Sequence, residues 1–336
     1  MGKDSAITWT DHTFNPWWGC SKAPGDPQCI NCFAERWAKR CGYRWGLDAE
    51  RRLFGEKHWR DPVLWNKQAE SAGIRQKVFA GSMCDVFERT KWQTSELDVA
   101  RAKLWSLIEE CSNLDWLLLT KRPQNVADMV PEAWMKGGWP RNAWMGISAG
   151  TQPILDERGR RLMQIPAPIQ FVSIEPMLGK LEVRNGRANR WSFPTRCDSH
   201  GRGCEYTDPG DAYVPFDWVI VGGESGPNAR PFYVPYARWI KHQVEEAGRA
   251  LFIKQMGACP VVSSREAAAA FQDVGAKLRL PGPAVIGLPS STATIGLALG
   301  HQAGADPSQW PEDLRVQQFP SLASKGGERE KGERRG

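Results

Sequence analysis

The chain has 336 residues, of which 41% are hydrophobic, and a formal net charge of +6. This length supports a large buried core, in one barrel-sized domain or in two smaller domains. No run of about 18 apolar residues occurs, and the chain starts without an apolar signal segment, so the sequence predicts neither a membrane span nor secretion. We therefore expect a cytoplasmic protein.

The net charge permits a polyanionic partner without demanding one. Nine cysteines are present, an odd number that is concentrated towards the start of the chain. In a chain without export signals, this usage favours thiol or metal chemistry over a disulfide framework.

The first predicted element is a short β-prone piece within residues 5–18, which leads into a loop rich in Gly, Pro and Asp. Cys20, Cys29 and Cys32 lie on this loop in a C-x8-C-x2-C arrangement. Apolar residues then recur with helical spacing to about residue 41, so Cys32 is expected at a helix start, where the helix dipole favours a thiolate. Residues 42–76 have no clear period and predict loops and a short helix.

From residue 77 onwards, strand-like and helix-like segments alternate. The expected strands are at 77–85 (strand, then loop), 114–120, 143–148, 169–176, 218–226 and 250–255, and the expected helices at 94–111, 125–129, 154–163 and 236–247. Buried strands alternating with helices predict a parallel α/β sheet or barrel. Polar residues stand where most of these strands end, at the edge that carries the site in such folds. They are Asp85, Thr120, Lys121, Arg122, Ser148, Ser173, Glu175, Glu224, Ser225, Lys254 and Gln255.

Two stretches interrupt this alternation. Residues 184–213 are rich in arginine and resemble an inserted loop, whereas residues 260–306 are rich in Ala, Gly, Pro and Ser and predict a poorly packed insertion. The arginine-rich stretch is the candidate for nucleic-acid contact, because arginines can bind phosphates and aromatic rings can stack on bases. Its residues are Arg184, Arg187, Arg190 and Trp191; a solvated loop is the alternative.

Three cysteines leave one position of a four-coordinate site open. His12 or Cys41 could complete a structural zinc site, a 4Fe-4S cluster could leave one iron free for a ligand, and three unrelated buried cysteines are the third possibility. The polar residues at the strand ends favour the cluster, because a structural zinc site needs no such ring.

Several motifs together resemble the three-cysteine-motif family found in bacteriophages and mobile elements, which is akin to radical S-adenosylmethionine enzymes. They are the cysteine loop, Leu119-Thr120-Lys121-Arg122-Pro123, Gly146-Ile147-Ser148, Ser173-Ile174-Glu175-Pro176, Gly222-Gly223-Glu224-Ser225-Gly226, Phe252-Ile253-Lys254-Gln255 and residues 306–316. The chain departs from most radical S-adenosylmethionine enzymes, whose pattern is C-x3-C-x2-C with an aromatic residue before the last cysteine; here Phe33 follows it.

The resemblance implies an α/β fold, a partial (β/α)6 barrel, which we place at residues 1–257. The arginine-rich insertion at 184–213 interrupts it, and a C-terminal extension at 258–323 follows. The tail at 324–336 is charged and rich in glycine, which predicts disorder. It also implies a 4Fe-4S cluster on the three cysteines, with S-adenosylmethionine bound to the free iron and cleaved to a 5′-deoxyadenosyl radical. An electron donor such as flavodoxin or ferredoxin would be a partner, in a host cytoplasm if a phage encodes the chain.

The resemblance and the strand-end positions together assign roles. Contacts with cofactor are expected from Phe33, Asp85, Ser148, Gly222 and Gly223, catalytic contacts with substrate from Glu175, Glu224 and Lys254, and contacts with carboxylate or phosphate from Lys121 and Arg122. The expected activity is modification of a nucleobase, in DNA, one version being the rearrangement of a hypermodified pyrimidine. The alternatives are a zinc-stabilised nucleic-acid-binding protein without catalysis and a metal-dependent nuclease or lyase.

Overall fold

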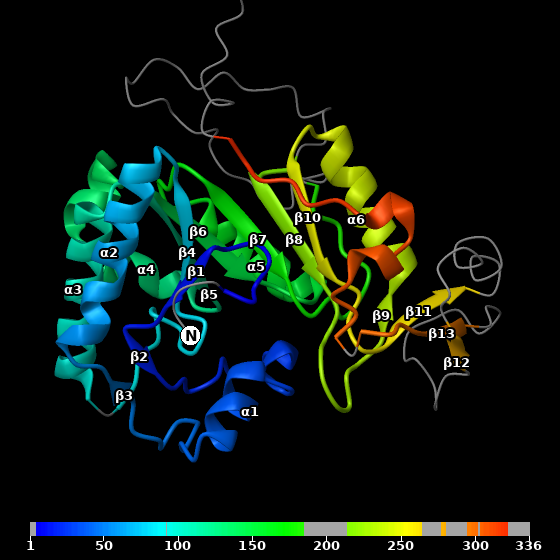
Figure 1. Cartoon of the computed structure of the whole chain (residues 1–336), viewed down its shortest axis with the longest axis horizontal. Coiled ribbons are helices and arrows are strands. Elements are labelled where there is room, and N and C mark those ends of the chain that lie inside the picture. The colour runs from blue at the N-terminus through cyan, green and yellow to red at the C-terminus, as the bar shows by residue number, and fades with distance from the viewer. Residues whose placement is uncertain are drawn as a thin grey trace, which may run out of the picture.

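The computed structural model describes residues 5–91, 93–184, 214–263, 277–279, 294–301 and 303–321. Its centre is a seven-stranded, wholly parallel sheet in the order β1-β4-β5-β6-β7-β8-β10 (Figure 1). The strands are β1 (His12–Phe14), β4 (Gln76–Ala80), β5 (Leu114–Thr120), β6 (Ala143–Ser148), β7 (Gln170–Ile174), β8 (Trp218–Gly222) and β10 (Ala250–Gln255). The seven strands lie in the sheet in the same order as along the chain, so the open sheet confirms the predicted partial α/β barrel.

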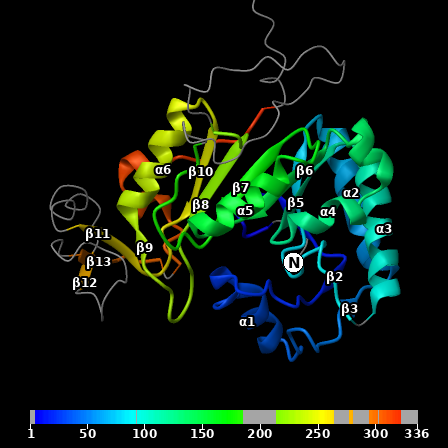
Figure 2. The ribbon, with the colours of Figure 1, turned by 180° about the vertical axis from the view of Figure 1, so that it is seen from behind.

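Helices connect the strands and pack on one face of the sheet, as the views from both sides show (Figures 1 and 2). They are α2 (Glu56–Ala72), α3 (Thr94–Glu110), α4 (Val126–Met129), α5 (Gln152–Leu162) and α6 (Val234–Glu246), with short helical turns η2 (Pro123–Asn125) and η3 (Trp134–Gly138). Helix α1 (Phe33–Arg40) lies apart from them, beyond the sheet edge where the strands end (Figure 1).

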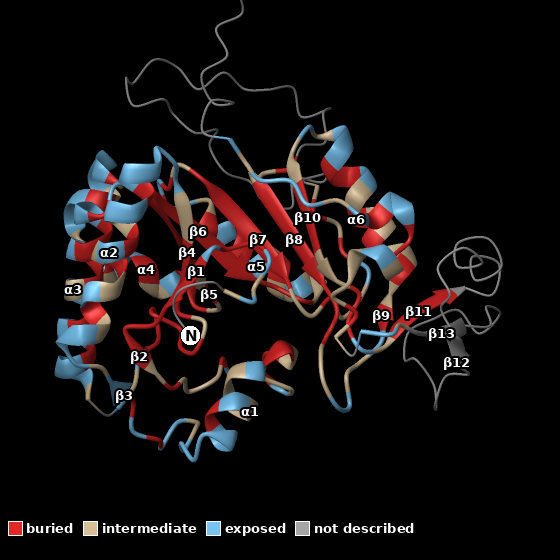
Figure 3. Cartoon of the chain, in the orientation of Figure 1, coloured by how far each residue is buried: buried red, intermediate tan, exposed pale blue. Residues whose placement is uncertain are grey.

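The strands of the main sheet are largely buried (Figure 3), and side chains of β4, β5, β6, β7, β8 and β10 are divided between two buried clusters. On β5, Trp116 and Leu118 pack into the large core under the helices, whereas Leu117 joins an aromatic cluster on the other face. Trp218 and Ile220 of β8 belong to the same aromatic cluster. Both faces of the sheet are therefore buried, which explains why the strands are continuous apolar runs instead of alternating polar and apolar residues.

Helix α2 is longer than the short helix expected between residues 42 and 76. Its 17 residues include Pro62, and Trp59 and Trp65 are buried against the core. Proline weakens a helix interior, and the polar residues between the tryptophans obscure the helical period. Tertiary packing of the two indole rings holds the helix together.

A second, four-stranded sheet has the order β12-β13-β11-β9. Its strands are β9 (Phe232–Tyr233), β11 (Pro260–Ser263), β12 (Lys277–Arg279) and β13 (Thr294–Ala298), and a two-stranded pair joins β2 (Trp17–Trp18) to β3 (Arg52–Leu53). The expectation of a poorly packed stretch at 260–306 therefore misses the strands that lie inside it. The turns η4 (Pro307–Gln309) and η5 (Glu312–Leu314) follow, and Phe252 of β10 forms an antiparallel bridge with Gln317, so the last described residues cover that edge of the main sheet.

None of the helices in these described ranges is both long enough and apolar enough to cross a membrane.

Candidate functional site

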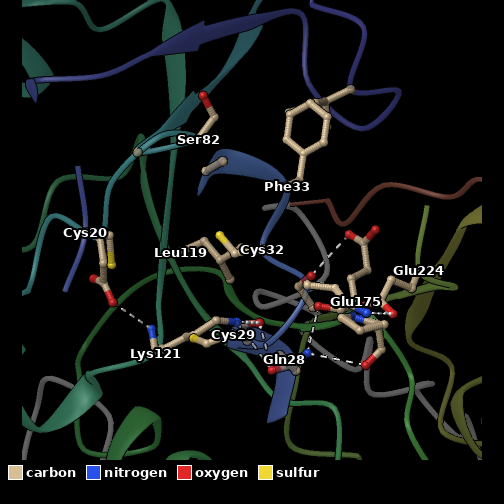
Figure 4. A pocket seen from close by; sticks show the side chains of 18 of the residues that line it. Cys20, Gln28, Cys29, Cys32, Phe33, Ser82, Leu119, Lys121, Glu175 and Glu224 are labelled. Carbon is tan, nitrogen blue, oxygen red and sulfur yellow. Dashed lines mark hydrogen bonds between the residues drawn. The ribbon is translucent and has the colours of Figure 1, made fainter. Parts of the chain in front are cut away.

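A cavity opens at the sheet edge where the parallel strands end (Figure 4). Its volume is about 1220 Å³ when the part open to solvent is included. The cysteine loop lines one side, and residues that follow strands β4 to β8, with the end of β10, line the other. The predicted site residues in this lining are Cys20, Cys29, Cys32, Phe33, Asp85, Lys121, Arg122, Ser148, Glu175, Gly223, Glu224 and Lys254. The fold therefore gathers side chains that are more than 200 positions apart in the sequence.

The three cysteines reach the cavity from different parts of the loop (Figure 4). Asp26 caps the turn η1 (Pro27–Cys29) by accepting a hydrogen bond from the Gln28 N–H, which places Cys29 at the end of that turn. Cys32 is the residue at the N-terminus of α1, as predicted. Within the described ranges, no three His, Cys, Asp or Glu side chains are close enough to hold a single metal ion.

Burial controls the protonation of two of these thiols. Burial, followed by the charge of Glu88, raises the pKa of Cys20 to about 12, although Arg122 opposes the shift. Burial also raises the pKa of Cys29, with Lys121 acting in the opposite direction. Both thiols are therefore protonated at neutral pH, and binding of a metal has to displace their protons.

Three buried or half-buried arginines hold the loop in place. Arg122 donates to Ser21 Oγ at 3.0 Å and to the Lys22 carbonyl at 2.5 Å, and its Nη1 lies 3.8 Å from Cys20 Sγ. Two further anchors come from other elements. Arg158 of α5 forms a buried ion pair with Asp26 at 2.8 Å, and Arg230 donates to the Pro27 carbonyl at 2.8 Å.

Gln28 occupies the middle of the strand edge. Its side-chain amide donates to the Glu175 carbonyl at 2.7 Å, and its Oε1 accepts from Ser148 at 3.2 Å and Lys121 at 3.4 Å. Lys121 also donates to Ser148 Oγ at 2.7 Å. Ser148 and Lys121 thus line the cavity, but the cysteine loop already engages their polar atoms.

Asp85 is similarly engaged. Its carboxylate pairs with Arg122 at 2.8 Å and accepts from Thr120 Oγ1 at 2.7 Å, from the Lys121 N–H at 3.1 Å and from the Phe87 N–H at 3.1 Å. Four donors satisfy a carboxylate, so this geometry favours a role in holding Arg122 and the strand ends over direct contact with a cofactor.

Glu224 forms a fork with Arg230. Its oxygens accept from Arg230 at 2.7 and 3.0 Å and from Asn31 Nδ2 at 2.9 Å. Burial alone would raise the pKa of Glu224, but hydrogen bonds from Arg230 and Asn31 outweigh it and hold that pKa below its usual value. Glu224 is therefore an anion that connects the loop after β8 to Asn31, the residue before Cys32.

Glu175 and Lys254 form an ion pair on the cavity wall, with 2.8 Å between Nζ and Oε1. Ser173 donates to the second oxygen of Glu175 at 3.2 Å. The two glycines at the end of β8 make room for this arrangement: a Cβ on Gly222 would lie 2.9 Å from Glu175 Oε1, and one on Gly223 would lie 2.3 Å from the Met256 carbonyl. Gly223 lines the cavity, whereas Gly222 lies behind Glu175.

The sequence reasoning missed several residues of the site. Gln28, Asn31 and Arg36 lie in or beside the C-x8-C-x2-C motif, yet nothing in their spacing indicated that each would reach a strand end. Glu88, which is 1% exposed, accepts from Ser21 and forms a buried pair with Arg51. The sequence offered one signal for Glu88: it is a charged residue three positions after Asp85, in the same loop at the end of β4.

The described residues among those predicted to contact nucleic acid do not all lie together in the structure. Arg187, Arg190 and Trp191 lie outside the described residues. Arg184 is described; it pairs with Glu246 and packs over the Trp239 ring, away from the cavity. Lys121 and Arg122 do line the cavity, where they bind the loop.

The two proposed extra zinc ligands are not part of the site. His12 stacks on Trp65 with ring centroids 4.4 Å apart, and Cys41 is an exposed residue at the far end of α1. Neither is among the residues that line the cavity.

Comparisons with known proteins bear mainly on the family. A search among curated proteins finds no match. Solved structures of spore photoproduct lyase are similar in fold. A form complexed with dinucleoside spore photoproduct is 10% identical over 89% of this chain and 72% of that chain, with a TM-score of 0.39. A singly substituted form is 9% identical over 89% and 72%, with a TM-score of 0.38.

A doubly substituted form with bound AdoMet and dinucleoside spore photoproduct is 10% identical over 52% of this chain, with a TM-score of 0.37. The match spans 48% of that protein's length, which is about half. These similarities concern the arrangement of strands and helices alone. The family described as "Protein of unknown function (DUF5131)" matches residues 4–279. Because this match covers most of the 336 residues of the chain, the chain belongs to the DUF5131 family.

Proposed function

We propose that the chain is a radical S-adenosylmethionine enzyme that holds a 4Fe-4S cluster on Cys20, Cys29 and Cys32 and modifies a nucleobase in DNA. The observation that carries this proposal is that the three cysteines and the Glu175–Lys254 ion pair line one cavity. The motifs shared with the three-cysteine-motif family of phages support the same assignment and add a one-electron donor, such as flavodoxin or ferredoxin, as a partner.

The residues around the cysteines suit an anionic cluster. The Ala23 N–H donates to Cys29 Sγ at 3.4 Å, and the Arg122 guanidinium lies next to Cys20 Sγ. Hydrogen bonds and positive charge at the sulfur atoms stabilise such clusters. A cubane cluster gives each cysteine its own iron, so it does not need three thiols converging on one ion. When bound, the cluster with S-adenosylmethionine would supply a 5′-deoxyadenosyl radical that removes a hydrogen atom from the substrate.

The chain's own residues divide into those that hold the site and those that face the substrate. Asp85 and Glu224 hold the strand ends and the loop, because donors already occupy their carboxylates. Lys254 binds an anionic group of the substrate, and Glu175 moves a proton to or from it, since both lie on the cavity wall and touch each other. Phe33 covers the cavity mouth, where it is 59% exposed.

Anaerobic purification tests the cluster directly. We expect a brown protein with roughly four irons per chain that forms 5′-deoxyadenosine when S-adenosylmethionine and dithionite are supplied. Cys32→Ala should lose both colour and product, whereas Cys41→Ala, on the same helix, should retain both. A colourless wild-type protein that holds one zinc would reject the proposal.

The substrate-facing pair has a separate test. Lys254→Met should keep the iron content and the formation of 5′-deoxyadenosine but lose modification of the base. If Lys254→Met instead loses iron, the lysine supports the cysteine loop and its assigned role is wrong.

A further inference from the structure

A second hollow lies beside the main cavity. It measures about 820 Å³ when its open part is included, and Trp45 lines both spaces. The hollow is formed by β2, the turn after α1 and β3; the lining residues that matter here are Trp18, Tyr43, Arg44, Trp45, Glu50 and Arg52. A linear ligand that occupies both the main cavity and the hollow would therefore contact Trp45 between them.

Aromatic rings hold one cation in this hollow. The Arg52 guanidinium lies over Trp18, Tyr43 and Phe54, at 4.9, 4.7 and 5.2 Å from the ring centroids. Stacking restrains the guanidinium but leaves its N–H edge free for an anion. Neither Arg52 nor Arg44 is ion-paired with a described residue. The Trp45 Nε1 is buried and has no hydrogen-bond partner among the described residues.

Helix α1 extends this surface towards the mouth of the main cavity. Phe33, Trp37 and Arg40 follow one another at intervals of four and three residues, so they share one helix face, and all three are exposed. Phe33 lines the main cavity and Ala38 lines the hollow. Figures 1 and 2 show α1 standing free of the helices that cover the sheet.

We infer that the hollow binds a nucleotide of a single-stranded or locally opened nucleic acid, next in the strand to the nucleotide that enters the main cavity. Aromatic faces that alternate with unpaired arginines suit a strand whose bases stack while its phosphates bind cations. One carboxylate, Glu50, also lines the hollow, beside three arginines, Arg44, Arg51 and Arg52, of which Arg51 is already paired with Glu88. An acidic protein partner would use the cations but would leave an aromatic hollow unfilled.

This inference rests on the proposed function for the nucleotide in the main cavity, but binding of the strand itself needs no cluster. It also places nucleic-acid contact on residues 33–52 instead of on Arg184, whose guanidinium is already paired with Glu246.

The test is fluorescence anisotropy with cluster-free protein and a fluorescein-labelled oligothymidylate of about 12 nucleotides, a length within the site sizes of single-strand binders. We expect salt-dependent binding that weakens roughly tenfold in Arg44→Glu, through lost phosphate contact, and roughly fivefold or more in Tyr43→Ala, through lost stacking. The matched controls are Arg141→Glu and Ile74→Ala, two exposed residues that precede strands at the opposite edge of the sheet. Both should bind as the wild type does.

The inference is supported if Arg44→Glu and Tyr43→Ala weaken oligonucleotide binding while the two control variants bind as the wild type does. No binding by the wild type, equal weakening by Arg141→Glu, or capture of an acidic redox protein without any oligonucleotide binding would overturn it. Cluster loading is measured separately, as iron content of the anaerobically purified protein. A chain that loads no cluster there, yet binds the strand through Arg44 and Tyr43, rejects the proposed function alone.

Discussion

Replacing Arg158 by methionine should unfold the protein more easily and loosen the cysteine loop. Arg158 and Asp26 form an ion pair at 2.8 Å in which the two side chains are only 6% and 1% exposed. Removing one partner of such a pair leaves a buried charge without compensation, which costs about 3–5 kcal/mol. Arg158 also donates to the Ser148 carbonyl, so the substitution frees a second acceptor at the end of β6.

Urea denaturation at neutral pH measures the effect as a shift of the midpoint at constant slope. Arg161→Met, an exposed arginine on the same helix, is the matched control and should change the free energy of unfolding by less than about 0.5 kcal/mol. The double variant Asp26→Asn with Arg158→Met should recover part of the loss, because no charge is then left buried. If Arg158→Met is as stable as Arg161→Met, the pair does not anchor the loop as argued.

Two further substitutions test the packing around the site. Gly223→Ala should destabilise the protein by roughly 1–3 kcal/mol in urea denaturation, because the new Cβ would lie 2.3 Å from the Met256 carbonyl. Gly179→Ala, whose Cβ would meet nothing within 4 Å, should leave the stability unchanged. Equal stability of the two variants would contradict the predicted clash at Gly223. Burial lowers the pKa of His58 below 6.5, so the folded state binds fewer protons than the unfolded state and stability should fall as the pH drops below that value. Melting temperatures at pH 7.5 and 5.5 check this: His58→Gln should reduce the drop and His242→Gln, which is exposed, should leave it unchanged.

The positions of the main strands from β5 onwards could be predicted from the sequence because most of them are continuous apolar runs bounded by polar residues. Leu114–Thr120 and Ala143–Ser148 have the predicted bounds, since strands buried on both faces need no alternation to be recognised. Helix α2 and the second sheet were harder to predict from the sequence, because their stability comes from contacts with distant residues. For α2, this is the packing of Trp59 and Trp65 in the core.

The site shows the same division between local and distant information. Cys20, Cys29 and Cys32 are recognisable by their spacing, and the residues at the strand ends by their position in a parallel sheet. Their contacts were not predictable: Asp85 and Glu224 appeared free to bind a ligand, yet Arg122 and Arg230 neutralise them in the fold.

A parallel α/β sheet, a cysteine triad on a loop before a helix and a row of polar residues where the strands end are all readable from the amino-acid sequence, because they depend on composition and short-range spacing. Which polar groups remain available to a ligand depends on the folded chain. The eight residues between Cys20 and Cys29 reach across the strand edge, and hydrogen bonds made by Gln28 and ion pairs such as Arg158–Asp26 engage atoms that the sequence leaves open. Such pairings join residues more than 100 positions apart, and their energies depend on burial that only the folded chain creates.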